Sequence, residues 1–127
     1  MTLPTLAIPV AGSSTQGEYA LVEACLPAGA ELPAHVAQRE DIVLHLLHGE
    51  LEVTVDRQEK TLTSGDSLTV DRGLPRRVRA TRPSRVLALL VPGGLEQILA
   101  VVADPDIDPD DRAALLAVGG VQALPAA

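Results

Sequence analysis

Few side chains in this sequence could carry chemistry. The chain has three histidines, His35, His45 and His48, and one cysteine, Cys25. An imidazole can act as a general acid or base, or can hydrogen-bond to a ligand. Arg76 offers a different chemistry, because a guanidinium can hold a carboxylate, sulfonate or phosphate with two parallel hydrogen bonds. Cys25 lies in an apolar run, which predicts a buried and unreactive thiol.

Glycines divide the centre of the chain into two segments with specific spacings. The first has five residues between a glycine and a His-x-Ala triplet, then four residues, an isoleucine, six residues and a glycine: Gly29, His35, Ala37, Ile42 and Gly49. The second has matching intervals at Gly65, Asp71, Gly73, Arg76 and Ala80. In this order the segments resemble the two motifs of the cupin superfamily. The stretch 92–96, followed by a helical pattern, is similar to the tail of small quercetin-dioxygenase-like members.

The resemblance covers roughly residues 18–120 and implies an all-β double-stranded β-helix, a jelly-roll-like barrel. It also implies where a metal would bind: the family's three histidines and one glutamate correspond to His35, Ala37, Ile42 and Arg76. A catalytic metal site needs about three protein ligands, and a fixed positive charge at Arg76 would repel a cation. We therefore expect Ala37 and Ile42 to be degenerate metal positions, with no metal and no cofactor.

An altered metal site is the alternative. Asp41 neighbours Ile42, and a β-bulge would turn its carboxylate inward. His45 and His48 follow on the same apolar run. Strict alternation from Ile42 would instead leave Asp41 and His45 on the outer face and His48 at the rim, so a set formed by Asp41, His45 or His48 stays open.

The resemblance places Arg76 inside the barrel, with Arg77 and Arg79 outside. A guanidinium cannot escape burial by losing its proton, so an anion or a strong acceptor must face it. A small anionic ligand, Glu23 on a preceding strand, or solvent at the barrel mouth could meet this need. His35, Arg76 and Glu23 are therefore the candidate ligand-binding residues.

Short apolar runs separated by Gly, Pro, Asp and Ser predict the strands of a small barrel. The runs are Tyr19–Leu26, Ile42–Leu47, 51–55, Thr61–Thr63, Leu68–Val70, Arg76–Ala80 and Val86–Val91. Leu95, Ile98, Leu99 and Val102 share one helical face. Asp108 before Pro109 predicts the N-cap of a second helix that ends at Gly119. We expect one domain over 1–127, with the barrel at about 18–92 and a helical tail at about 93–120.

Composition limits the partners. The net charge of −7 excludes binding driven by nucleic-acid phosphates, and a single aromatic residue leaves no stacking platform. No apolar run is longer than the six residues of Val86–Val91, which is too short for a membrane span. Because this run is apolar on both faces, it predicts a homodimer through the sheets. The first ten residues contain no Lys or Arg, so a cytoplasmic location is expected.

Three functional hypotheses follow. The first is a non-catalytic module that binds a small acidic metabolite through Arg76 and His35. The second is a metal-independent isomerase, epimerase or cyclase with His35 as general acid or base, so whether the protein is an enzyme is left open. The third is a structural dimer with a filled barrel.

Overall fold

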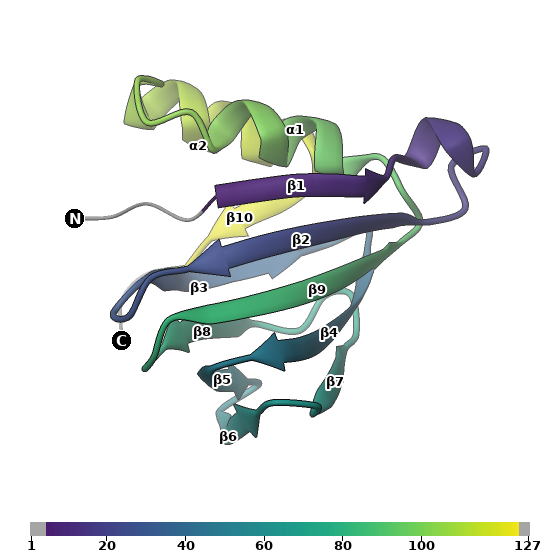
Figure 1. Cartoon of the computed structure of the whole chain (residues 1–127). Helices are drawn as coiled ribbons and strands as arrows, with labels where there is room; N and C mark the ends of the chain where they lie inside the picture. The colour runs from purple at the N-terminus through teal and green to yellow at the C-terminus, as the bar shows by residue number, and fades with distance from the viewer. Residues whose placement is uncertain (1–4, 125–127) are drawn as a thin grey trace.

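The computed structural model describes residues 5–124 and contains two five-stranded antiparallel sheets that face each other, with two helices beside them (Figure 1). The first sheet has the order β1 (Thr5–Val10), β2 (Ala20–Leu26), β9 (Ser84–Val91), β4 (Asp41–His48) and β7 (Ser67–Val70). The second has the order β10 (Val121–Ala123), β3 (Glu31–Ala37), β8 (Arg76–Ala80), β5 (Glu50–Val55) and β6 (Gln58–Thr63). The helices are α1 (Leu95–Val102) and α2 (Pro109–Val118). The predicted all-β double-stranded β-helix with C-terminal helices is confirmed.

Alternation along the strands fixes which side chains enter the barrel. In β8, Arg76, Val78 and Ala80 are buried, whereas Arg77 and Arg79 are exposed. Successive residues of a strand point to opposite faces, so the arginine-rich strand places one guanidinium inside and two outside. The predicted inward direction of Arg76 is confirmed.

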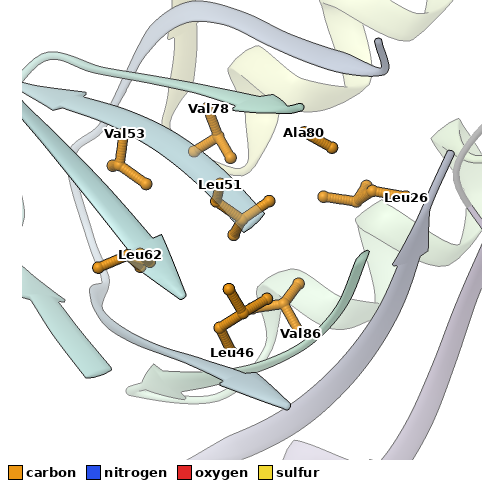
Figure 2. Packing of buried hydrophobic residues seen from close by; sticks show 8 residues of the cluster. All are labelled: Leu26, Leu46, Leu51, Val53, Leu62, Val78, Ala80 and Val86. Atoms are coloured by element: carbon orange, nitrogen blue, oxygen red, sulfur yellow. The ribbon is translucent and has the colours of Figure 1, made fainter. Parts of the chain in front are cut away.

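Aliphatic side chains form two clusters inside the barrel. The larger draws on both sheets, and Figure 2 shows its eight buried members converging: Leu26, Leu46, Leu51, Val53, Leu62, Val78, Ala80 and Val86. The second lies toward the helices and contains Ala20, Val22, Ala37, Leu90, Leu95 and Val121. Leu44 packs on the first cluster and Ile42 on the second. The chain has no Phe or Trp, so tight packing of small branched side chains must supply the core.

The turn between β4 and β5 requires a glycine. Gly49 has a φ of 108°, and a Cβ there would lie 2.6 Å from the carbonyl oxygen of Pro83. The Ser84 hydroxyl crosses the same corner, where it accepts a hydrogen bond from the Glu50 backbone N–H at 3.0 Å. The spacing that marks the first motif thus ends where two chain segments touch.

Two strands lie outside the range predicted for the barrel. β1 pairs with β2, and β10 pairs with β3, so each extends a sheet. The predicted second helix is confirmed, because the Asp108 side chain accepts a hydrogen bond from the Asp110 N–H at 2.8 Å and Pro109 occupies the first turn. Neither helix described in residues 5–124 is long and apolar enough to cross a bilayer.

The predicted burial of Cys25 is wrong. Cys25 is exposed, because Val22 and Leu26 occupy the inward face of β2 and Cys25 falls on the opposite one. The apolar character of the whole run concealed this alternation.

Candidate functional site

His35 and Arg76 share the interior face of the second sheet. The two residues are directly opposite each other in the β3–β8 pair, with Ala123 of β10 and Val55 of β5 completing the row. Residues opposite each other in an antiparallel pair point to the same face. Because Val78 of β8 packs in the core, the shared face is the interior.

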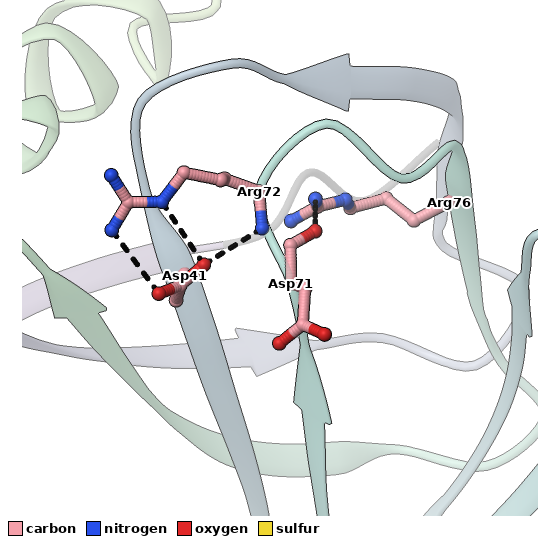
Figure 3. A network of polar contacts seen from close by, with 4 residues as sticks. All are labelled: Asp41, Asp71, Arg72 and Arg76. Carbon is pink, nitrogen blue, oxygen red and sulfur yellow. Dashed lines mark hydrogen bonds and ion pairs between the residues drawn. The ribbon is translucent and has the colours of Figure 1, made fainter.

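The Arg76 guanidinium forms several hydrogen bonds, but one of its nitrogens is left without a partner among residues 5–124. It is 4% exposed. Its Nε donates to the carbonyl of Leu74 at 3.2 Å, and its Nη2 donates to the carbonyls of Asp71 at 3.0 Å and Leu74 at 3.2 Å. Figure 3 shows the guanidinium beneath the loop that carries these carbonyls. Nη1 has no partner.

The charge of Arg76 is not neutralised by contact. Among residues 5–124, the ion pairs within 4.0 Å are Arg72–Asp41, Arg77–Glu31 and Arg85–Glu23. Burial lowers the pKa of the Arg76 guanidinium, and the charges of Glu40 and Asp41 oppose that change. Since a guanidinium remains protonated in proteins, the site holds a buried cation.

His35 presents a free ring nitrogen. Its Nδ1 lies 2.8 Å from the carbonyl oxygen of Pro33. A carbonyl can only accept, so Nδ1 carries the hydrogen and Nε2 is an acceptor in the neutral ring. Burial, with a smaller contribution from the Arg76 charge, lowers the pKa of His35, and the Pro33 hydrogen bond opposes the shift. His35 is therefore neutral at pH 7 and can serve as a base or an acceptor.

Protonation of His35 should make stability depend on pH. Its folded pKa lies below the ordinary histidine value of 6.5, so its contribution to stability is complete above pH 6.5 and is lost as pH falls through the folded pKa. We expect the free energy of unfolding to fall between about pH 7 and pH 5, and His35→Gln to remove this component. Urea denaturation across that range measures it. His45→Gln is the control, and an identical pH slope in wild type and His35→Gln would contradict the assignment.

Glu40 also faces this region, and the sequence did not single it out. It lies between β3 and β4 and is 5% exposed, and its Oε2 has no hydrogen-bond partner in the part of the chain that the structure describes. Burial raises the pKa of the Glu40 carboxyl, which is opposed by its own N–H and by the charges of Arg39, Arg72 and Arg76. No sequence signal indicates its direction, because it lies in the turn before β4, where the alternation of a strand does not apply.

Glu23 is not brought to Arg76. The Oε1 of Glu23 accepts a hydrogen bond from the Nε of Arg85 on the neighbouring strand β9. Val22 occupies the interior face of β2, so alternation turns Glu23 outward. This corrects the expectation of an internal Glu23–Arg76 ion pair.

Asp41, His45 and His48 are dispersed. The Asp41 carboxylate accepts hydrogen bonds from Arg72, at 2.8 Å from N, 3.2 Å from Nε and 3.1 Å from Nη2 (Figure 3). These bonds lower the pKa of Asp41. The Nδ1 of His45 lies 2.6 Å from the hydroxyl of Ser67. His48 lies opposite Arg85 in the register of β4 and β9. Within residues 5–124, no three His, Cys, Asp or Glu side chains are grouped to hold a metal ion.

The residues at the four positions that the resemblance assigns to a metal do not fit one. Ala37 is buried among apolar side chains, with Ile42 packed against the same cluster. Of the four, only His35 offers a donor that metals use, and Arg76 contributes a positive charge. Of these four side chains, those of His35 and Arg76 can form hydrogen bonds.

A separate hollow of about 380 Å³ opens at the edge of the first sheet where β2 and β4 end and β9 begins. It is lined by Thr5, Cys25, Leu26, Pro27, His48, Pro83, Ser84 and Arg85. It shares no residue with the interior site of His35, Arg76 and Glu40.

Comparison with known proteins gave a clear family match. Residues 22–92 match the model described as "Cupin domain". KdgF from Halomonas sp. has a similar structure, with a TM-score of 0.68 and 20% identity, covering 74% of this chain and 83% of that one. A predicted oxalate decarboxylase from Thermotoga maritima has a TM-score of 0.66 and 18% identity, covering 69% and 79% of the two chains.

An RmlC-like cupin from Shewanella frigidimarina is similar as well. Its TM-score is 0.60 with 26% identity, and the match covers 64% of this chain and 72% of that one. No curated protein matches the chain. The solved structures below 25% identity support the barrel fold and do not extend to activity.

Proposed function

Because this chain belongs to the cupin family, we propose that it uses the family's barrel to bind a small acidic metabolite, with Arg76 as the anion receptor in place of a metal. One observation carries the proposal: the Nη1 of Arg76 is buried and has no hydrogen-bond partner among the described residues. A buried charge without a counter-charge is costly. An anion at Nη1 would supply both the missing hydrogen bond and the missing charge.

The neighbouring groups suit such a ligand. The backbone carbonyls of Asp71 and Leu74 fix the guanidinium through Nε and Nη2. Nη1 therefore remains oriented, and little conformational entropy is lost on binding. His35 adds an acceptor at Nε2, which can bind a hydroxyl or a protonated group of the same ligand.

A metal-independent enzyme is the second candidate, and one observation favours it. The Pro33 carbonyl orients the His35 ring with Nε2 free, and the lowered pKa keeps that nitrogen unprotonated at pH 7. An isomerase, epimerase or cyclase would need such a base. A carbonyl stabilises a protonated imidazole less than a carboxylate would, and this places binding first.

Anions should stabilise the protein. We expect sulfate, phosphate and small carboxylates such as acetate and glycolate to raise Tm in a saturable way, because they bind the folded state alone. Thermal-shift titration at constant ionic strength, with chloride as the reference salt, measures the effect. A Tm that follows ionic strength alone, without saturation, would contradict an anion site.

We also propose a homodimer through the outer face of the first sheet. The cross-strand row Val10, Leu21, Leu89 and Val43 is apolar and half-buried on that face. Two copies related by a two-fold axis would bury this apolar face against each other without any other partner. Light scattering should give twice the 13.2 kDa chain mass, and Leu89→Glu should shift the mass to that of one chain. A wild-type monomer at micromolar concentrations would refute the dimer.

A further inference from the structure

The molecule holds two buried polar atoms that lack a partner, and they carry opposite charge. Among residues 5–124 these are Nη1 of Arg76 and Oε2 of Glu40. Their residues are 4% and 5% exposed. Buried polar groups are nearly always hydrogen-bonded, so each such atom calls for an explanation. Because these two atoms belong to oppositely charged side chains in one region, a single explanation should account for both.

Arg76 and Glu40 lie on chain segments that contact each other. The Gly73 N–H donates to the Ala37 carbonyl at 2.8 Å, and Asp41, next to Glu40, accepts a hydrogen bond from the Arg72 N–H at 2.8 Å. The loop that holds Arg76 therefore lies against the turn that carries Glu40, and each charge acts on the pKa of the other group. The pair is nevertheless absent from the ion pairs within 4.0 Å in the described part of the chain. The carbonyls of Asp71 and Leu74 hold the guanidinium where it is, so it cannot swing across to the carboxylate without losing those bonds.

This arrangement specifies both ends of a ligand. Nη1 of Arg76 requires an acceptor, best an anionic one. Oε2 of Glu40 requires a donor, and Nε2 of the half-buried His35, whose Nδ1 hydrogen is directed to Pro33, can accept a second one. A simple carboxylate would satisfy Arg76 and would leave the two acceptors unpaired. A molecule with a carboxylate and a nearby hydroxyl or ammonium group would satisfy all of them.

We propose that Arg76 and Glu40 form the two poles of one site for a small carboxylic acid that bears a hydroxyl or ammonium group. This inference rests on the proposed function and specifies its ligand. The carboxylate binds Nη1 of Arg76, and the donor group binds Oε2 of Glu40, with Nε2 of His35 as a second acceptor. Glu40 thus selects the ligand by recognising its donor.

Matched ligand series test the selectivity. Isothermal titration of the intact protein compares acetate, glycolate and glycine; propionate, 3-hydroxypropionate and 3-aminopropionate; and butyrate, 4-hydroxybutyrate and 4-aminobutyrate. In the series whose length fits, the donor-bearing members should bind about tenfold more tightly than the parent acid. Equal affinities within every series would overturn the inference, and the proposed anion site would stand if the parent acids bind.

Variants of Glu40 assign the preference. Glu40→Met keeps the length without the acceptor and should abolish the tenfold preference while binding of the parent acid persists. Glu40→Gln keeps an acceptor oxygen without the charge, so it should retain the preference for the hydroxyl and lose that for the ammonium. Glu52→Met, at an exposed position of β5, is the control and should change neither preference.

The outcomes separate the two levels of the account. If both Glu40 variants keep the full preference, Glu40 is not the second pole and the inference is overturned. If no acid in any series binds wild type, the inference and the proposed function fail together. If Glu40→Met does not fold, the affinities of the same acids for wild type and for Glu40→Gln still show whether Glu40 recognises the donor group.

Discussion

Arg76→Met should abolish the rise in Tm caused by carboxylates and sulfate, and the unliganded variant should be as stable as wild type or more stable. Truncating a buried charge that binds an anion weakens binding by about 2–5 kcal/mol, or at least about thirtyfold. Replacing a buried charged group by an apolar one of similar volume is neutral or stabilising, by about 1–4 kcal/mol. Thermal shift and urea denaturation measure the two effects.

Arg79→Met is the matched control, because Arg79 lies on the same strand and is exposed. It should leave anion binding intact and change stability by less than about 0.5 kcal/mol. If Arg76→Met destabilises the unliganded protein by several kcal/mol and the anion effect persists, Arg76 is a structural group that the loop carbonyls satisfy.

Leu46→Ala should cost about 2–5 kcal/mol of the free energy of unfolding. Leu46 is 0% exposed and packs with Leu51 and Val86 across the two sheets (Figure 2). The aliphatic core has no large aromatic ring to shift into the space, so a cavity should remain. Leu47→Ala is the control: Leu47 is 40% exposed and should lose less than about 1 kcal/mol. Equal losses in the two variants would mean that the β4 register is wrong.

Much of the fold could be predicted from the sequence, because glycines and alternation are local signals. Gly49 marks a corner where a Cβ does not fit, and Leu51 and Val53 alternate with polar residues in β5. The resemblance to the second motif correctly placed Arg76 inside. β1 and β10 were not foreseen, because they are short strands whose pairing depends on edges formed by distant parts of the chain.

The candidate site was predicted in part. His35 and Arg76 were identified through motif spacing, and the structure brings them together. Glu23 was misplaced because its strand is apolar at most positions, so the sequence does not show which of its residues face the interior. Glu40 was missed because it lies in a turn, where no strand period indicates the direction of a side chain. Its burial follows from the packing of that turn, which is a tertiary effect.

The most direct test of the central claim observes the Arg76 guanidinium itself. In a nitrogen–proton NMR titration of ¹⁵N-labelled protein, the arginine side-chain signal that disappears in Arg76→Lys identifies this group. Addition of glycolate should shift that signal to saturation, with an affinity equal to the one obtained from Tm, because hydrogen bonding to an anion changes its environment. The other arginine signals should shift little. A saturable shift at other arginines with the Arg76 signal unmoved would contradict the account.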